Sequence, residues 1–132
     1  MRRFSSLTLL LVAVTLVLSG CGGEGTRPVT GAVTMDGDPL AKVTITFYPV
    51  EGGRANSIAD TNEQGEYALR YTSKAKGAIP GKYKVLISKT KKAASGETVE
   101  TIPLRYNNKS ELVAEVTSSD DNVFNFDLTS EK

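Results

Sequence analysis

The residue types that most often carry chemistry are scarce in this chain of 132 residues. It contains no histidine, which is both the commonest general base and a frequent metal ligand. This composition excludes Ser-His-Asp and Cys-His catalysis, as well as histidine-based zinc, copper and iron sites. The single thiol, Cys21, has no partner for an intrachain disulfide, so the fold must rest on its hydrophobic core. We expect no enzymatic activity and no cofactor.

Cys21 lies directly after a segment typical of a secretory signal peptide. Two arginines near the N-terminus precede an apolar run over 7–18, which is shorter than the roughly 20 residues of a transmembrane helix. Small residues then lead to the cysteine, and Leu18-Ser19-Gly20-Cys21 resembles the lipobox of bacterial lipoproteins. The resemblance implies cleavage between Gly20 and Cys21 and attachment of lipid to the Cys21 sulfur. An ordinary signal peptide followed by an unrelated cysteine is the alternative.

A lipidated Cys21 anchors a chain without spanning the membrane, because two or more acyl chains hold a protein stably at a bilayer. We therefore expect a signal peptide over 1–20, a lipidated flexible tether over 21–27 and a folded domain over 28–132. The partner implied is membrane lipid, and the location implied is the bacterial cell envelope. Position 22 is glycine rather than the aspartate that retains some lipoproteins at the inner membrane, which favours the outer membrane.

Two acidic segments contain side chains that could supply oxygen ligands to calcium. Asp36 and Asp38 flank a glycine, and Asp120-Asp121-Asn122 form a continuous run. Each segment offers only two or three oxygen-bearing side chains, without a loop of EF-hand type around them. Such residues also favour tight turns, so we expect turns here and no metal site.

Two tyrosines are the candidate ligand contacts. Carbohydrate-binding sandwiches generally use exposed aromatic rings, and this chain has five tyrosines and no tryptophan. Alternation places three tyrosines in the core and leaves Tyr48 and Tyr106 as candidate contacts for a glycan or a peptide. The lysine-rich segment 89–100 is a candidate for contacts with anionic lipid headgroups or acidic wall polymers. Glu97 and Glu100 offset much of its charge, so we expect a mobile, solvated loop there.

The charge balance argues against a nucleic-acid partner. Sixteen Lys and Arg residues against fifteen Asp and Glu residues give a formal net charge of +1. Nucleic-acid-binding domains usually carry a strongly basic face. The remaining partner classes are membrane lipid and an envelope protein or glycan.

Short strands must position these candidate residues. From Val29 onward, apolar residues recur at every second position, as in strands with one buried face. Turn-forming pairs such as Asp36-Gly37 interrupt the pattern at short intervals. The length fits one domain, and several short strands at this spacing favour a sandwich or a small barrel. We expect seven strands, near 28–35, 42–48, 55–60, 66–72, 82–89, 112–117 and 123–128.

The same alternation predicts the packing of particular residues. Gly31 lies in the middle of a predicted strand, which indicates a bulge or a close backbone approach. Gly65 is expected to close a hairpin at positive φ. Tyr83 follows Pro80-Gly81 and is expected to bury its ring while its hydroxyl bonds to nearby backbone. We expect one core that contains Phe47, Tyr83, Val85, Phe124 and Phe126.

Three motifs together resemble a known family. They are Val29-x-Gly31-x-Val33 followed by Asp36-Gly37-x-Pro39-Leu40, then Asp60 to Gly65 before Tyr67-x-Leu69, and Ile79-Pro80-Gly81-x-Tyr83-x-Val85. In this order they resemble the carboxypeptidase-regulatory-like, transthyretin-like domains found as small lipoproteins of planctomycete-type bacteria. The resemblance implies an all-β, Greek-key β-sandwich of the transthyretin (prealbumin) type after a cleaved signal peptide. We expect a non-catalytic, lipid-anchored envelope module with a structural or assembly role, or alternatively a glycan- or peptide-binding module.

Overall fold

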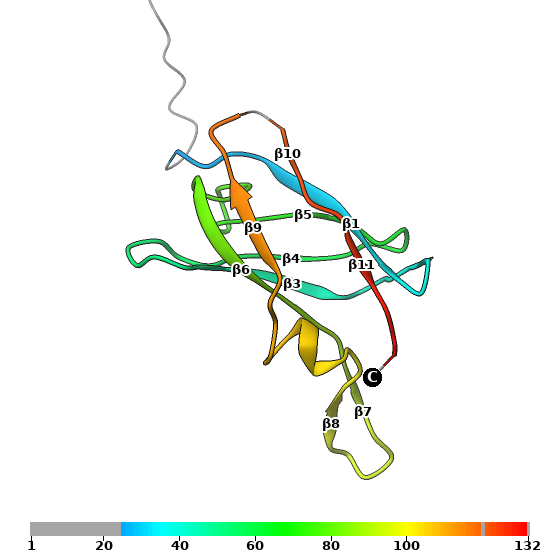
Figure 1. Ribbon diagram of the computed structural model, residues 1–132. Helices are drawn as coiled ribbons and strands as arrows, with labels where there is room; N and C mark the ends of the chain where they lie inside the picture. Colours follow the sequence, from blue (N-terminus) through cyan, green and yellow to red (C-terminus); the bar gives the residue numbers. More distant parts are fainter. Residues whose placement is uncertain (1–24, 120, 132) are drawn as a thin grey trace, which may run out of the picture.

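The computed structural model describes residues 25–119 and 121–131, and within them the chain is all-β apart from one short 3₁₀ helix. Two sheets form a β-sandwich, and a separate hairpin projects from one end (Figure 1). The predicted signal peptide, with Gly20 and Cys21, lies outside the described residues. No helix in the described ranges is long and apolar enough to cross a membrane.

The first sheet is organised by β1 (Val29–Met35), because the four other strands of that sheet all pair with it. β10 (Asn122–Val123) and β11 (Phe126–Leu128) run parallel to it. β2 (Asp38–Pro39) and β5 (Glu66–Ala68) run antiparallel to it. The first and last strands of the domain are therefore hydrogen-bonded neighbours, which closes the fold.

The second sheet is antiparallel and has the strand order β4-β3-β6-β9. Its two inner strands are β3 (Thr44–Pro49) and β6 (Gly81–Ser88), and its edge strands are β4 (Ser57–Asp60) and β9 (Val113–Val116). In the β3–β6 pair, Thr46 lies opposite Leu86 and Tyr48 lies opposite Lys84. Each inner strand has a partner on both sides over part of its length, since β4 pairs with Thr44–Phe47 of β3 and β9 pairs with Gly81–Lys84 of β6.

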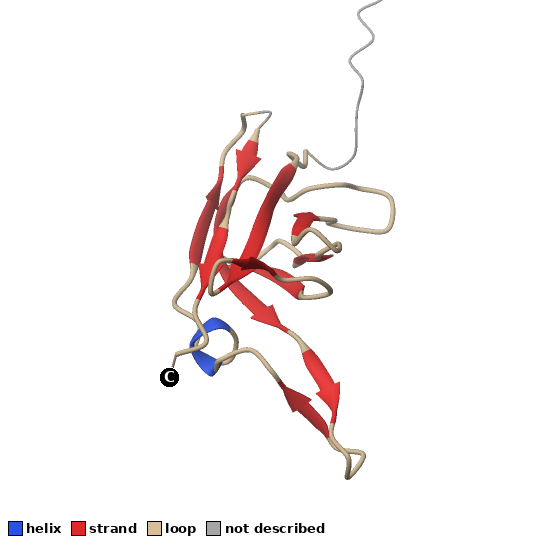
Figure 2. Cartoon of the chain, turned by 90° about the vertical axis from the view of Figure 1, so that its right-hand side faces the viewer, coloured by secondary structure: helices blue, strands red, loops and turns tan. Residues whose placement is uncertain are grey.

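The lysine-rich segment is a hairpin and not the irregular loop that the sequence predicts. β7 (Thr90–Lys92) pairs with β8 (Thr98–Glu100), and the Gly96 amide at the tip donates to the Ala93 carbonyl. Gly96 has φ of +89°, a value that glycine adopts without strain. The 3₁₀ helix η1 (Leu104–Tyr106) follows directly. Figure 2 shows the hairpin extending away from the body of the sandwich.

The described residues form eleven strands where the sequence predicts seven. The predicted strand 123–128 is divided into β10 and β11, and β2, β7 and β8 arise in segments predicted as turns or loop. The division has a local cause, because the Asn125 side chain accepts a hydrogen bond of 3.0 Å from the Ala32 amide. A side chain thus replaces the ladder bond at this point.

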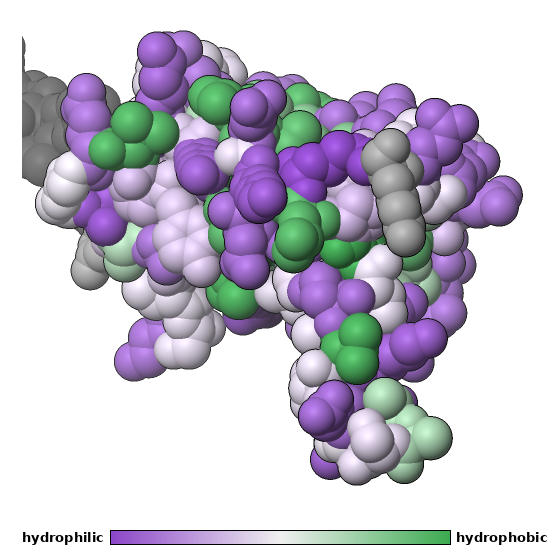
Figure 3. Space-filling model, turned by 60° about the horizontal axis from the view of Figure 1, so that its bottom comes forward, coloured by the Kyte–Doolittle hydropathy of each residue, from purple (hydrophilic) through white to green (hydrophobic). Residues whose placement is uncertain are grey.

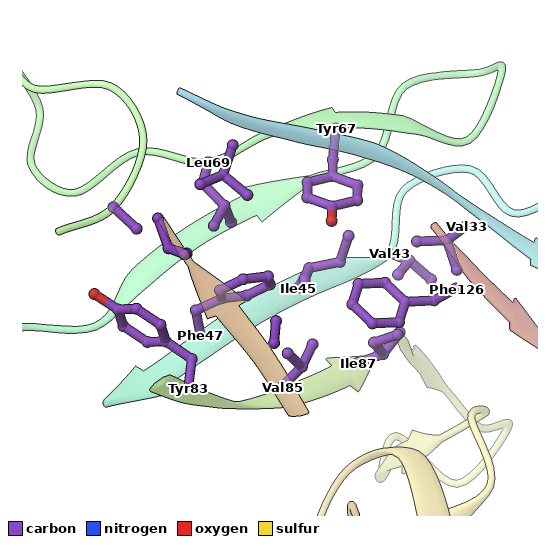
Figure 4. Close-up of a cluster of buried hydrophobic side chains, with 14 of the residues drawn as sticks. Val33, Val43, Ile45, Phe47, Tyr67, Leu69, Tyr83, Val85, Ile87 and Phe126 are labelled. Carbon is purple, nitrogen blue, oxygen red and sulfur yellow. The ribbon is translucent and has the colours of Figure 1, made fainter. Parts of the chain in front are cut away.

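The core lies between the two sheets and follows the predicted alternation. Phe47, Tyr83, Val85 and Phe126 are buried in one cluster, and Phe124 is half-buried against it. The Phe47 ring centroid lies 5.7 Å from that of Tyr83 and 5.9 Å from that of Phe124. Figure 4 shows Phe47, Tyr83 and Phe126 among the buried side chains that the two sheets direct toward one another. The inside and outside assignment of the strands is therefore confirmed.

Gly31 marks a close approach of two backbone segments, as predicted. A Cβ atom at this position would lie 1.8 Å from the Phe124 carbonyl oxygen and 2.9 Å from the Tyr67 ring. The same carbonyl accepts a hydrogen bond of 2.7 Å from the Tyr67 hydroxyl. Only a residue without a side chain allows this contact.

Two further local predictions are confirmed. Gly65 has φ of +76° and donates its amide hydrogen to the Asn62 carbonyl, which closes the turn before β5. Tyr83 is fully buried, and its hydroxyl donates to the Ile79 carbonyl at 2.5 Å. This is the predicted tyrosine corner, in which one ring fills the core and ties down the preceding turn.

The sandwich has two distinct ends. β1 begins at one end, beside the ends of β6 and β9 that carry Gly81 and Val116, which are paired with each other. Figure 1 shows the β7–β8 hairpin and η1 at the opposite end. Arg27, just before β1, forms a two-way backbone bridge with Ala78. The chain therefore joins the domain at the end remote from the hairpin.

Candidate functional site

Both acidic segments that were considered as calcium ligands contain side chains bonded to neighbouring residues, and Asp120 lies outside the described residues. Asp36 has φ of +51°, and its carboxylate accepts hydrogen bonds from the Ser130 hydroxyl at 2.5 Å and from the Ser130 amide at 3.0 Å. These bonds hold the pKa of Asp36 below its ordinary value. The Asn122 amide group bonds with the backbone of Thr117 and Ser119. Across the described residues, no group of three or more His, Cys, Asp or Glu side chains is placed to hold a metal ion.

Tyr106 is held against the domain by contacts at its ring and at its hydroxyl. Its ring packs on the core, and the Arg105 guanidinium lies 4.7 Å from the ring centroid. The Tyr106 hydroxyl accepts a hydrogen bond of 3.1 Å from the Thr129 amide. Tyr106 therefore fixes the C-terminal segment to η1, and its hydroxyl is engaged before any ligand arrives.

Tyr48 has the surroundings of a ligand contact. It projects from the outer face of β3, and 40% of its surface is exposed. Its hydroxyl forms no hydrogen bond with any of the described residues, in contrast to the Tyr67, Tyr83 and Tyr106 hydroxyls. Tyr48 and Tyr106 line different hollows, so the structure does not bring the two predicted contacts together.

A hollow of about 260 Å³ lies beside Tyr48. Its floor comes from the outer faces of β3 and β6, which contribute Thr46, Tyr48, Leu86 and Ser88. Its wall comes from the end of β8 and from η1 and the residues after it, which contribute Glu100, Leu104, Asn107 and Asn108. In Figure 3, which looks toward the hairpin end, hydrophobic residues are interspersed among hydrophilic ones over the body of the domain. We define this hollow as the Tyr48 hollow.

Glu100 is the charged group in the lining of the Tyr48 hollow. One carboxylate oxygen accepts hydrogen bonds from the Lys89 amide at 2.8 Å and the Ile102 amide at 3.0 Å. The other accepts one from the Ser88 hydroxyl at 2.5 Å. Partial burial acts to raise the pKa of Glu100, but the hydrogen bonds led by that from Ser88 outweigh it, so the pKa lies below its ordinary value. Glu100 is therefore an ionised acceptor in a fixed position at neutral pH.

The wall of the Tyr48 hollow is held in place by buried hydrogen bonds. Asn107 is 5% exposed, and its side-chain amide donates to the Ile102 and Pro103 carbonyls at 3.1 and 3.3 Å. The Lys89 ammonium donates to the Ala41 carbonyl at 2.9 Å, which fixes the base of the hairpin to the sandwich. These contacts determine the shape of the hollow without occupying it.

A larger, shallower concavity of about 740 Å³ lies over β1 and β5. Two of its polar side chains are committed to the fold: Asp60 accepts a hydrogen bond of 2.7 Å from Thr44, and Asn62 accepts bonds from two amides of its own turn. Its aromatic residue, Tyr67, is 4% exposed. The Tyr48 hollow is smaller but contains an exposed ring and a fixed carboxylate, so it is the better candidate site.

The sequence identified Tyr48 but not Glu100 as part of this site. The sequence predicts that Glu100 offsets the charge of a lysine-rich loop. In the structure its side chain is half-buried at the base of the hairpin and accepts a hydrogen bond from Ser88. The signal for the hairpin is weak but present, because β-branched residues at 90, 98 and 99 flank a glycine-containing turn.

Comparisons with known proteins support the β-sandwich fold but do not assign the chain to a family. No family model matches the chain, and no curated protein is similar to it. The structure is similar to that of BcpA*(D312A), the major pilin subunit of Bacillus cereus, with a TM-score of 0.50 and 10% sequence identity. A 9R-lipoxygenase from Cyanothece has a TM-score of 0.42 and 12% identity.

The chain corresponds to a part of each of these larger proteins. The match covers 79% of this chain but 29% of the pilin chain, and 80% of this chain but 16% of the lipoxygenase chain. At this level of identity, the pilin supports a β-sandwich fold alone. The resemblance to the carboxypeptidase-regulatory-like family remains a prediction from motifs.

Proposed function

We propose that this chain is a non-catalytic, lipid-anchored β-sandwich of the bacterial cell envelope with a structural or assembly role. The observation that carries the proposal is what the ionisable groups with shifted pKa values form hydrogen bonds with. Asp36 fixes the C-terminal segment, Glu100 fixes the hairpin, and Tyr83 fixes the turn before β6. Perturbed groups at an active site are aimed at a substrate, whereas these are aimed at their own backbone or at neighbouring side chains.

The pilin likeness is compatible with this role. The solved structure with this likeness is that of a major pilin subunit. Because the identity is 10%, the likeness supports the idea through the shared fold and not through shared residues.

The proposed anchor also sets the orientation of the domain. Cys21 is four residues before Gly25, and an extended chain spans at most about 3.3–3.6 Å per residue, or roughly 14 Å in total. The end of the sandwich at which β1 begins is therefore the membrane-facing end in this proposal. The hairpin, with Lys91 and Lys92, then points away from the bilayer, which disfavours a role for these lysines in binding lipid headgroups.

Lipid anchoring is tested by metabolic labelling with a fatty-acid analogue in the producing cells. We expect label on the wild-type chain in the outer-membrane fraction and none on Cys21→Ala. A Ser19→Ala variant is the matched control, because it keeps a small residue in the motif and should still be labelled. Continued labelling of Cys21→Ala would place the modification elsewhere and refute the anchor.

A further inference from the structure

The floor of the Tyr48 hollow is the outer face of a sheet, so we expect recognition there to use side chains. The floor comes from β3 and β6, the two inner strands of the second sheet. A peptide that binds by adding a strand needs an unpaired sheet edge, whereas this floor presents the face of a sheet, in which Thr46 is paired with both Ile58 and Leu86. This arrangement disfavours an extended peptide as the ligand.

The lining combines an apolar surface with hydrogen-bonding groups at its rim. The partly exposed Tyr48 ring lies with Leu86 and with Leu104, which is 50% exposed. The Thr46 hydroxyl and the Asn108 amide add donors and acceptors beside them. A tyrosine ring offers flat apolar area together with a polar tip, and a sugar ring has the complementary surface of C–H faces edged by hydroxyls.

Glu100 adds a directional acceptor. An ionised carboxylate has about four lone-pair sites, and the hydrogen bonds from Ser88, Lys89 and Ile102 occupy three of them. The oxygen bonded to Ser88 therefore retains acceptor capacity for a ligand hydroxyl. Because Glu100 is negative and is the ionic group of the lining, the hollow disfavours phosphate and other anions and suits a neutral or amino sugar.

The size and placement of the hollow agree with this chemistry. Its volume of about 260 Å³ lies just below the roughly 300–1,000 Å³ typical of drug-sized ligands, which suits a single sugar ring. Its wall comes from the end of β8 and from η1, which lie at the end of the sandwich remote from the start of β1 (Figure 1).

We propose that the Tyr48 hollow binds one pyranose unit of an envelope glycan, with the sugar ring stacked on Tyr48 and a hydroxyl donating to Glu100. This site does not depend on the lipid anchor, and the two proposals fail independently: a variant that loses binding keeps its labelling at Cys21.

The test measures binding of chitotetraose and maltotetraose to the full chain purified in detergent, by saturation-transfer NMR and calorimetry. We expect saturable binding of at least one of these sugars, weakened about tenfold by Tyr48→Ala and by no more than about threefold by Tyr48→Phe, which keeps the ring. Leu104→Ala should also weaken binding, since it removes part of the wall. Val113→Ala is the matched control, because Val113 is 61% exposed on the same sheet but lies outside the hollow.

Melting curves of the variants establish that each is folded before its binding is compared. The proposal is overturned if neither sugar binds saturably, or if a sugar binds equally well to Tyr48→Ala and to the wild type. Binding of an unstructured peptide that is lost in Tyr48→Ala, without binding of either sugar, would also overturn it and assign the hollow to peptides.

Discussion

Substitution of Gly31 by alanine tests the packing of the two ends of the chain against each other. The new Cβ atom would lie 1.8 Å from the Phe124 carbonyl oxygen, where ordinary contact begins at 3.4 Å. The obstacle is backbone and not the end of a flexible side chain, so the segment between β10 and β11 must withdraw by about 1.6 Å. A shift of this size breaks local hydrogen bonds as well as packing.

The expected loss can be worked out from those contacts. The Phe124 amide donates to the Thr30 carbonyl at 2.9 Å, and the Phe124 carbonyl accepts from the Tyr67 hydroxyl at 2.7 Å. Each bond contributes about 1 kcal/mol, and overpacking adds about 1–3 kcal/mol. We therefore expect Gly31→Ala to lower the free energy of unfolding by about 3 kcal/mol or more. For a domain of this size, the melting temperature should fall by about 12 °C or more.

The assay is thermal and urea unfolding of the full chain followed by circular dichroism, with Gly52→Ala as the matched control. Gly52 has no atom within 4 Å of a built Cβ and no positive φ, so alanine there should be neutral or stabilise by up to about 1 kcal/mol. If Gly31→Ala and Gly52→Ala agree within about 1 kcal/mol, the close approach of β1 to Phe124 is wrong.

Three further perturbations test the core and the ionisable groups. Phe126→Ala should cost about 3–5 kcal/mol in urea unfolding because the ring is 92% buried; an unchanged midpoint would mean that the strand faces are exchanged. Burial raises the pKa of Tyr67, so the unfolded chain loses this proton first, and the free energy of unfolding should fall as the pH rises above about 10. Tyr67→Phe should remove that part of the alkaline slope, and an unchanged slope would assign it to other groups. The pKa of Glu100 is lowered, so the stability that it contributes is present at neutral pH and is lost as the pH falls below about 4. Glu100→Gln should weaken the pH dependence of the free energy of unfolding in this acidic range. An unchanged pH dependence would contradict the hydrogen bonds assigned to Glu100.

The strand positions could be predicted because buried residues recur at every second position. Ile45, Phe47, Val85 and Ile87 are all fully buried, and each alternates with a residue on the outer face. A shift of one residue would turn every one of these side chains toward solvent, so the alternation determines the faces of each strand.

The pairing of strands was harder to predict, since it depends on contacts between distant residues. The parallel pairing of β1 with β10 and β11 joins residues more than 90 positions apart, such as Val33 and Phe126. The hairpin is hard to predict because every residue of its two strands except the half-buried Glu100 is exposed, which removes the periodic signal.

The candidate site was predictable only in part. Tyr48 was found because alternation placed it outside the core of an otherwise buried strand. Glu100 was missed because its role depends on donors from Ser88, Lys89 and Ile102, whose convergence is set by the hairpin and not by any local motif.

The most direct test of the lipid-anchored envelope module is the intact mass of the chain isolated from the membranes of its own cells. We expect a mature chain that begins at Cys21 and carries the additional mass of its acyl groups on the N-terminal peptide. A chain that retains residues 1–20, or one whose Cys21 carries a free thiol, would contradict the proposal.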